Sequence, residues 1–280
     1  MRRRVESEGR LELARGRTLF TAFFEPSTRT RLSFQFAMIK LGGSVVDLGP
    51  EEVTSRAKGE SPEDTLRTVD SYNPDVIVVR HWEPGFAARA AEICRAPVIN
   101  AGDGYNEHPT QALLDAYTIW RMLGGIDGVT VGLMGDLKYS RTIPSLIYTL
   151  SNFKDITVYF ISPPQLRPRE EVLKVLDQRG VRYEFTRNLS EVISRLDVLY
   201  VTRLQRERMN QDEYERLKGS YTISLNMLSR HERIPLIMHP LPRTWELATD
   251  VDQLPQAVYF EQARNGLYVR MGLLKIILGV

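Results

Sequence analysis

Hydroxyl and guanidinium side chains gather directly after the first apolar run of the chain. The run at residues 18–24 leads into the segment STRTR, residues 27–31, and an apolar pattern typical of a helix follows. A helix that begins at Ser27 or Thr28 offers unpaired backbone N–H groups and the positive end of its dipole. Together with the Ser, Thr and Arg side chains, these groups predict a phosphate-binding turn. An ordinary Ser/Thr cap beside solvated arginines is the alternative.

A polar loop follows, with the sequence EEVTSRAKGES at residues 51–61. A Ser-Pro pair at its end, with Pro62 in the first helical position, predicts that the next helix begins there. Ser55 and Lys58 belong to this loop and could close on an anion. A merely solvated surface loop is the alternative.

Two further apolar runs in the first half of the chain end in polar residues. Arg80 follows the run at 76–79, and the run at 97–99 leads to His108 and Gln111 at the start of a helix. The helix dipole favours the neutral form of such a histidine, which suits it to donate a hydrogen bond to a carbonyl oxygen. A capping histidine without a chemical role is the alternative.

The second half of the chain repeats this arrangement with residues that suit a carboxylate ligand. Arg141 and Thr142 come after the apolar run at 129–134, and Arg203 comes soon after the run at 198–201. A guanidinium group matches a carboxylate bidentately, so these arginines, with the neighbouring Gln205, predict a site for a substrate carboxylate.

Two other chemistries are disfavoured. A dinucleotide-binding turn would show the spacing G-x-G-x-x-G after residues 129–134, but only Gly132 and Gly135 are available there. The single cysteine, Cys94, excludes an internal disulfide and an all-cysteine metal cage, and its apolar setting favours a packing role over that of a nucleophile.

The elements that position these residues alternate between strand and helix patterns. This alternation predicts an α/β fold with two lobes, each a doubly wound parallel sheet with helices on both faces. Ligands of such sheets bind at the carboxyl ends of the strands. The boundary between the lobes is expected after the helix pattern at 108–122, where three glycines follow. The expected strands lie at residues 18–24, 44–48, 76–79, 97–99, 129–134, 156–161, 198–201, 223–225 and 236–238, and two further helices at 168–178 and 211–217.

Composition excludes several classes of protein. The 280 residues carry 37 Lys and Arg against 35 Asp and Glu, a net charge of +2, which is too small for a protein that coats nucleic acid. The sequence contains no apolar run of the roughly 20 residues needed to span a bilayer. We therefore expect a soluble, cytoplasmic protein whose anion sites are local, without nucleic acid or membrane as a partner.

Seven ordered motifs resemble those of the transcarbamoylase family, and within it the aspartate-specific branch. The resemblance covers almost the whole chain through FFEPSTRTRLSF, SRAKGE, VRH, NAGDGYNEHPTQALLD, GDLKYSRT, VTRLQRER and MHPLPR. It implies an enzyme that joins carbamoyl phosphate to L-aspartate, releasing N-carbamoyl-L-aspartate and phosphate, an early committed step of de novo pyrimidine biosynthesis. It implies no metal or other cofactor.

The resemblance also implies roles for individual residues. The carbamoyl phosphate site comprises Ser27, Thr28, Arg29 and Thr30 for the phosphate, Thr30, Arg80 and His108 for the carbonyl oxygen, Gln111 and the backbone of Pro240 and Leu241 for the carbamoyl amide, and Ser55 and Lys58 from the polar loop. The aspartate site comprises Lys58, Arg141, Thr142, Arg203, Gln205 and Leu241. The residues expected to be catalytic are Arg29, Thr30, Lys58, Arg80 and His108. An oxygen of the departing phosphate is expected to accept the amine proton.

Domains and assembly follow from the same resemblance. Residues 1–123 with 264–280 are expected to bind carbamoyl phosphate, and residues 124–263 to bind aspartate, with helices joining the two lobes. The loop with Lys58 is expected to enter the active site of a neighbouring subunit in a homotrimer, to which a regulatory chain could be added. Family members usually carry a further N-terminal helix, so the segment 262–278 is expected to have lost part of its partner.

Two rival functions stay open at this point. An ornithine-specific transcarbamoylase would bind a cationic side chain and typically carries a cysteine where His239 stands, whereas Arg203 and Gln205 favour an anionic substrate. A catalytically silent assembly subunit is the other rival. The presence of Arg29 and His108 argues against it.

Overall fold

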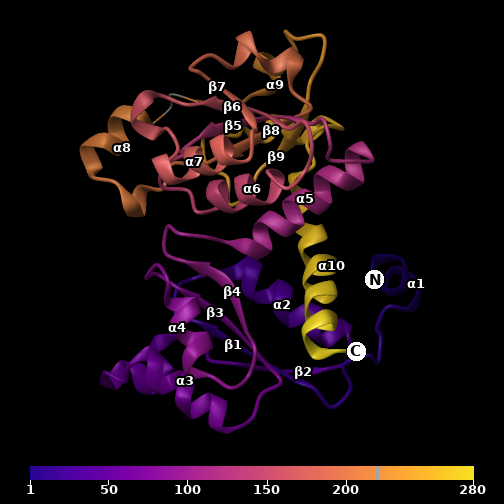
Figure 1. The fold of residues 1–280 in the computed structure, drawn as a ribbon, viewed down its shortest axis with the longest axis vertical. Helices are drawn as coiled ribbons and strands as arrows, with labels where there is room; N and C mark the ends of the chain where they lie inside the picture. The colour runs from indigo at the N-terminus through magenta and orange to yellow at the C-terminus, as the bar shows by residue number, and fades with distance from the viewer. Residues whose placement is uncertain (219–220) are drawn as a thin grey trace. The chain divides into compact units, whose positions relative to one another are not determined.

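The computed structural model describes residues 1–218 and 221–280, and these form two compact units (Figure 1). Unit 1 comprises Met1–Thr110 with Arg264–Val280, and unit 2 comprises Gln111–Ala263. Each unit contains one parallel sheet, with strand order β2-β1-β3-β4 in unit 1 and β7-β6-β5-β8-β9 in unit 2. The predicted fold of two parallel-sheet α/β lobes is therefore confirmed.

Unit 1 is built around the smaller sheet. Its strands are β1 (Thr18–Phe23), β2 (Ser44–Asp47), β3 (Val76–His81) and β4 (Val98–Asp103). Its helices are α1 (Arg2–Glu8), α2 (Thr28–Lys40), α3 (Pro62–Ser71), α4 (Phe86–Ile93) and most of α10 (Tyr259–Leu278), which begins in unit 2.

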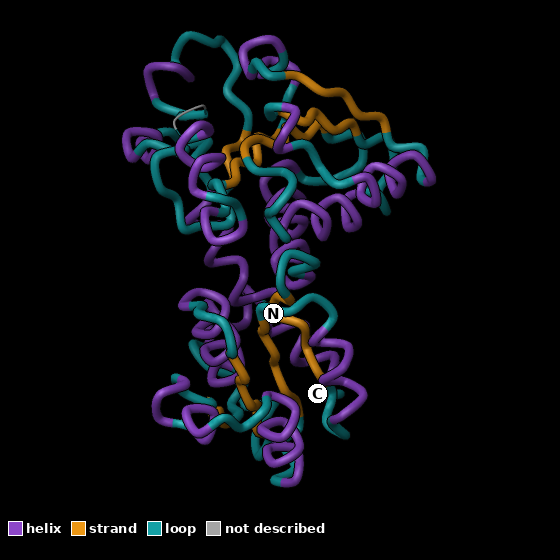
Figure 2. Tube along the Cα trace, turned by 90° about the vertical axis from the view of Figure 1, so that its left-hand side faces the viewer, coloured by secondary structure: helices purple, strands orange, loops and turns teal. Residues whose placement is uncertain are grey.

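Both faces of this sheet are covered, as alternate residues of β3 show. Val76 and Val78 pack in a cluster with residues of α1, α2 and α10, whereas Ile77 and Val79 pack in a second cluster with residues of α3 and α4. Because side chains alternate across a strand, the two clusters lie on opposite faces of the sheet. Helices on both sides of the strands are visible in Figure 2. This double coverage explains the nearly continuous apolar strands of the sequence.

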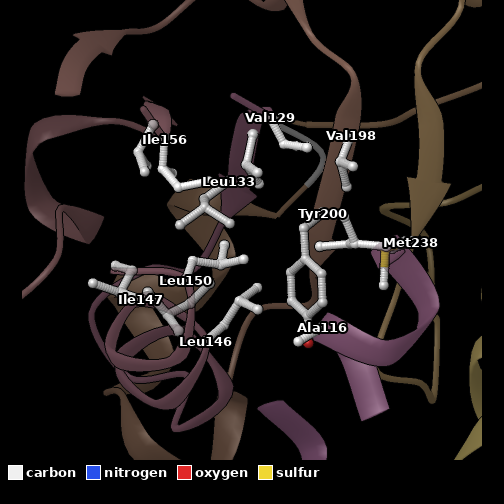
Figure 3. Packing of buried hydrophobic residues seen from close by; sticks show 14 of the residues in the cluster. Ala116, Val129, Leu133, Leu146, Ile147, Leu150, Ile156, Val198, Tyr200 and Met238 are labelled. Carbon is white, nitrogen blue, oxygen red and sulfur yellow. The ribbon is translucent and has the colours of Figure 1, made fainter. Parts of the chain in front are cut away.

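Unit 2 repeats the plan with five strands. They are β5 (Thr130–Gly135), β6 (Thr157–Ile161), β7 (Arg182–Thr186), β8 (Val198–Thr202) and β9 (Leu236–Met238). Its other helices are α5 (Pro109–Leu123), which begins in unit 1, α6 (Thr142–Leu150), α7 (Glu170–Gln178), α8 (Gln211–Leu217) and α9 (Leu225–Leu228). On one face, Leu133 of β5 and Tyr200 of β8 pack against α5 and α6 (Figure 3). The opposite face is covered by α9 and short 3₁₀ turns.

One predicted strand was wrong, and one strand was not predicted. The expected strand at 223–225 is absent among the described residues, where Ile223 forms only an isolated bridge to Leu247 and α9 begins at Leu225. Ser224 ends the extended chain because its hydroxyl accepts a hydrogen bond from the Met227 N–H and so caps the helix. Strand β7, an edge strand, was not predicted, since its residues are exposed or only half-buried.

The first residues of the chain form a helix that packs within unit 1. Val5 of α1 is buried in the cluster that contains Tyr268 of α10. Arg2 donates to the Asn265 side chain over 2.9 Å, and Tyr268 donates to Glu6 over 3.2 Å. Helix α10 therefore has α1 as a partner. Among the described residues no helix is long and apolar enough to cross a membrane.

Candidate active site

The turn between β1 and α2 presents the hydroxyl groups and N–H groups that the sequence predicted. Ser27 is the N-cap residue, with extended backbone (φ −160°, ψ 108°), and its side chain makes no capping hydrogen bond to the described residues. Thr28 and Arg29 are exposed, whereas Thr30 is buried. The first N–H groups of α2 have no partner within the helix, so this turn can receive an anion.

Thr30 and His108 are brought together although 78 positions separate them. The Thr30 Oγ1 and His108 Nε2 atoms lie 3.4 Å apart, and both residues are buried. A hydroxyl and a neutral imidazole in such a position can donate hydrogen bonds to one carbonyl oxygen.

Arg80 lies beside the same turn. Arg80 of β3 lies opposite Phe23 of the neighbouring strand β1, and its Nη2 atom lies 3.4 Å from Glu25 Oε1. The Arg80 side chain is only 12% exposed, so its charge acts in surroundings from which water is largely excluded. Ser27, Thr30, Arg80 and His108 thus belong to the carboxyl ends of β1, β3 and β4 in unit 1, where ligands of parallel sheets bind.

A buried arginine beside this site was missed by the sequence analysis. Arg270 of α10 is 3% exposed, donates to Thr110 Oγ1 over 3.3 Å and lies 5.0 Å from the ring centre of Phe34. It supports Thr110, two residues after His108. A cation within the otherwise apolar sequence GLYVRMGLL was the available signal.

The two candidate residues of the polar loop lie on the surface of unit 1. Ser55 and Lys58 are exposed in a 3₁₀ turn (Ser55–Lys58), and no hydrogen bond or ion pair of the described residues joins Lys58 to the turn before α2. Arg56, by contrast, has only 9% of its side chain exposed. It lies over the rings of Phe24 (4.9 Å) and Trp82 (5.5 Å) and pairs with Glu51 (3.1 Å). Arg56 is therefore the anchor of this loop.

His81 is a second residue that the sequence analysis did not single out. Its ring stacks between Trp82 (3.9 Å) and Phe86 (3.8 Å), and its Nδ1 accepts a hydrogen bond from the Glu83 N–H. Burial lowers the pKa of His81 to about 4, although nearby carboxylates oppose the shift. His81 is consequently a neutral packing residue.

In unit 2, Asp136 orders the loops after β5 and β8. It is buried and accepts hydrogen bonds from the backbone N–H groups of Tyr139 (2.9 Å) and Gln205 (3.0 Å). Burial raises the pKa of Asp136 to about 6, although these hydrogen bonds oppose the shift. Gly135 has φ 107°, and a Cβ atom there would lie 2.2 Å from the Thr202 carbonyl oxygen. Only glycine allows the two loops to approach so closely.

The predicted carboxylate-binding residues lie in these two loops. Arg141 and Thr142 are buried at the start of α6. Arg203 pairs with Glu207 through two contacts of 3.1 and 2.6 Å, and the Gln205 amide donates to the Arg203 carbonyl oxygen over 3.2 Å. Glu207 thereby holds the Arg203 guanidinium in a defined orientation.

The turn after β9 is fixed by His239. Its Nδ1 accepts from the Leu241 N–H over 2.8 Å, and its Nε2 lies 2.9 Å from Glu246 Oε1. Burial raises the pKa of Glu246, but hydrogen bonds from His239 and Thr244 lower it more, so this pKa is below its ordinary value. Leu241 has a left-handed backbone (φ 55°), a costly conformation for leucine that these contacts maintain.

Gln111, at the start of unit 2, is buried and donates to Asp115 Oδ1 over 2.8 Å. Among residues 1–218 and 221–280, no three His, Cys, Asp or Glu side chains gather as ligands for a metal ion. The predicted residues offer hydrogen-bond donors, guanidinium groups and helix N–H groups, which are suited to anions and to a carbonyl oxygen.

Comparison with known proteins identifies the family. Residues 1–121 match the family model for the carbamoyl-P binding domain of aspartate/ornithine carbamoyltransferase, and residues 127–277 match that for the Asp/Orn binding domain. The aspartate carbamoyltransferase catalytic subunit of Hyperthermus butylicus is 53% identical over 277 residues, which cover 98% of this chain and 88% of the relative. That of Thermofilum pendens is 54% identical over 265 residues, covering 94% and 84%.

Solved structures agree. The catalytic subunit of M. jannaschii aspartate transcarbamoylase has a TM-score of 0.91 at 46% identity, covering 99% of this chain and 90% of that one. Aspartate transcarbamoylase from Trypanosoma cruzi, in complex with N-(phosphonacetyl)-L-aspartic acid, has a TM-score of 0.91 at 42% identity, covering 98% and 87%. With two family models that match in chain order and with relatives aligned over nearly its whole length, this chain belongs to the aspartate/ornithine carbamoyltransferase family.

Proposed function

We infer that this chain is a transferase that moves the carbamoyl group of carbamoyl phosphate to the amino group of L-aspartate. The observation that carries the inference is the likeness, over 98% of the chain, to a T. cruzi aspartate transcarbamoylase whose structure holds carbamoyl phosphate and aspartate. The hydroxyl-rich turn before α2 and the arginines of unit 2 supply the groups that two such anionic substrates require. Residues 1–123 with 264–280 are proposed as the carbamoyl phosphate domain and residues 124–263 as the aspartate domain.

The proposed phosphate site is the turn before α2. Ser27, whose side chain makes no capping hydrogen bond to the described residues, and the exposed Thr28 offer hydroxyl groups, and the exposed Arg29 offers a guanidinium. The first N–H groups of the helix have no partner within it. The proposed donors to the carbonyl oxygen are Thr30, Arg80 and His108. As the amine attacks, negative charge develops on that oxygen, and donors already in place stabilise it at little reorganisation cost.

The amine must be neutral to attack, and its proton must leave afterwards. An oxygen of the departing phosphate, which is basic and adjacent to the reacting carbon, is the proposed acceptor. The aspartate carboxylates are assigned to Arg141, Thr142, Arg203 and Gln205, and the carbamoyl amide to Gln111 and the backbone of Pro240 and Leu241. Lys58 is proposed to contact both substrates, as is Leu241, with Ser55 assisting at the phosphate.

We further propose a homotrimer in which the loop with Ser55 and Lys58 serves a neighbouring subunit. Both residues are exposed, and no side-chain hydrogen bond or ion pair joins either of them to another residue of the described part of the chain. Helix α2 also carries an exposed apolar stripe, Leu32, Phe36 and Ile39, at the spacing of one helix face. Such a stripe suits a contact between copies of the chain. A place in pyrimidine biosynthesis, a cytoplasmic location and a regulatory chain stay predictions.

The test is a colorimetric assay of carbamoyl-aspartate formed from carbamoyl phosphate and aspartate by the purified full chain. Ornithine in place of aspartate is the matched control, because it presents a cationic side chain to Arg203. Product with aspartate and none with ornithine is expected. Absence of product from a folded protein would favour a silent assembly subunit, and product with ornithine would overturn the aspartate assignment.

A further inference from the structure

A buried carboxylate in unit 2, Asp115 of α5, receives three hydrogen bonds from three different elements. Gln111 Nε2, one turn earlier in α5, donates to its Oδ1 over 2.8 Å, and Gln262 Nε2 of α10 donates to the same atom over 2.7 Å. The Tyr200 hydroxyl of β8 donates to its Oδ2 over 2.8 Å. Asp115 is 0% exposed, so these donors replace the water that the charge has lost.

A carboxylate can only accept hydrogen bonds, and this limits how the two amides can be turned. Both Gln111 and Gln262 must present their NH₂ groups to Asp115, which leaves both amide oxygens directed elsewhere. The oxygen of Gln262 accepts the His239 N–H over 2.9 Å. One negative charge therefore fixes the orientation of two amides and, through one of them, the backbone at residue 239.

The Gln111 amide and the backbone at residue 239, both fixed through Asp115, include or adjoin the two proposed contacts of the carbamoyl amide. Gln111 is one of them, and the backbone at Pro240 and Leu241, directly after His239, is the other. Because the Gln111 NH₂ group faces Asp115, the amide oxygen of Gln111 is the end available to a ligand. This oxygen can accept a hydrogen bond from an NH₂ group of the ligand but forms none with a methyl group. Freed from Asp115, Gln111 could present either end.

We propose that Asp115 is a positioning residue that makes the site selective for a carbamoyl over an acetyl group, by holding Gln111 and the 239–241 turn with their acceptors directed at the substrate NH₂. The inference rests on the proposed function, which assigns Gln111 and this turn to carbamoyl phosphate.

The readout is a ratio of two constants measured on the full chain: the inhibition constant of acetyl phosphate divided by the KM of carbamoyl phosphate. Acetyl phosphate carries a methyl group where carbamoyl phosphate carries NH₂. In Asp115→Leu, a side chain of similar branched shape accepts no hydrogen bond, so neither glutamine is held by its NH₂ group. Loss of one oriented hydrogen bond to the substrate corresponds to a fall in this ratio of about tenfold.

The matched control is Asp70→Leu in unit 1. Asp70 is also buried and also accepts several hydrogen bonds, from the N–H groups of Arg95 and Ala96 and from the Arg95 side chain. This variant should lose stability while the ratio stays within about twofold of the unmodified value. Tyr200→Phe, which removes one donor but leaves both glutamines held, should likewise keep the ratio.

The outcomes separate the possibilities. If Asp115→Leu weakens both phosphates equally, Asp115 is merely structural and the proposal is wrong. If Asp115→Leu does not fold, Gln111→Met decides, because it keeps Asp115 with its donors Gln262 and Tyr200 and must lower the ratio at least as much. An unchanged ratio in Gln111→Met overturns the proposal. Absence of product from the unmodified protein would instead refute the proposed function.

Discussion

Arg29 is exposed in the first turn of α2, outside the apolar core. We therefore expect Arg29→Ala to keep the thermal transition and lose most activity, since a charge-assisted contact to the leaving phosphate is worth a few kcal/mol, or about 100-fold in kcat/KM. Arg31→Ala is the matched control, because Arg31 lies two residues later and pairs with Asp47 over 3.5 Å. Equal activity in the two variants would contradict the assignment of Arg29 to the phosphate.

His81 sets a pH dependence of stability in unit 1. Burial lowers its folded pKa to about 4 from an ordinary 6.5. Between these values the unfolded chain binds a proton that the native chain does not, so the native state loses stability as pH falls from 6.5 towards 4. At pH 5 the loss from this residue is on the order of 2 kcal/mol.

Urea unfolding at pH 7 and pH 5, at one protein concentration, measures this loss. In His81→Phe, which keeps an aromatic ring between Trp82 and Phe86 and cannot titrate, the difference between the two pH values should shrink by a similar amount. The other titrating groups are shared by both proteins. Parallel pH dependences would show that His81 is protonated in the native state.

At the scale of elements, the loop with Ser55 and Lys58 is held by Arg56. We expect Arg56→Met, which keeps a long apolar chain but loses the charge, to free the loop from Phe24, Trp82 and Glu51. The consequence should be faster proteolytic cleavage within residues 51–60 and a lower kcat, with the rest of unit 1 equally stable. Cleavage mapped by mass spectrometry measures the effect.

Arg67→Met serves as the control for this experiment. Arg67 forms an exposed ion pair with Asp64 in the helix that follows the loop, and pairs of this kind contribute little. Its cleavage pattern and kcat should match those of the unmodified protein. If Arg56→Met also matched it, the ring contacts of Arg56 would have no part in holding the loop.

The sequence predicted correctly those helices and strands whose formation depends on their own residues. The inner strands β1, β3, β5, β6 and β8 were predictable because burial on both faces demands apolar runs, and α3 because Ser61 and Pro62 begin it. The segment at 223–225 was wrongly predicted as a strand because Ile223 is apolar and buried, as in a strand, whereas the next residue, Ser224, caps helix α9. Asp115 and Arg270 could not be assigned, since their partners lie 147 and 160 positions away and only the fold brings them together.

At the scale of the whole molecule, the phosphate and carbonyl oxygen of carbamoyl phosphate are assigned to residues of unit 1, and the aspartate carboxylates to residues of unit 2. Arg203→Ala should therefore raise the KM for aspartate by about 100-fold and change that for carbamoyl phosphate much less, because a guanidinium contact to a carboxylate is lost in unit 2 alone. Steady-state kinetics with each substrate varied in turn checks this contrast. Equal weakening of both substrates would contradict the assignment.

The proposed shared site can be tested by mixing two inactive variants, Lys58→Ala and Arg29→Ala. In a cyclic trimer with both kinds of chain, one interface joins an intact Arg29 to an intact Lys58 of its neighbour. Dissociating and reassociating the variants together should therefore restore activity that neither regains alone. Hybrid trimers without activity would show that Lys58 serves its own subunit.

Unit 1 is assembled from both ends of the chain, and this has a consequence for how the protein is made on the ribosome. Tyr268, Met271 and Leu274 of α10 share one apolar cluster with Leu19 and Phe34, so that side of the first sheet is covered only by α1 and α2 until residues 264–280 have been synthesised. Unit 2 is continuous and is synthesised before them. Unit 1 therefore begins before unit 2 but completes its core after it, and in the meantime the incompletely covered face of its sheet is what a nascent-chain chaperone would encounter.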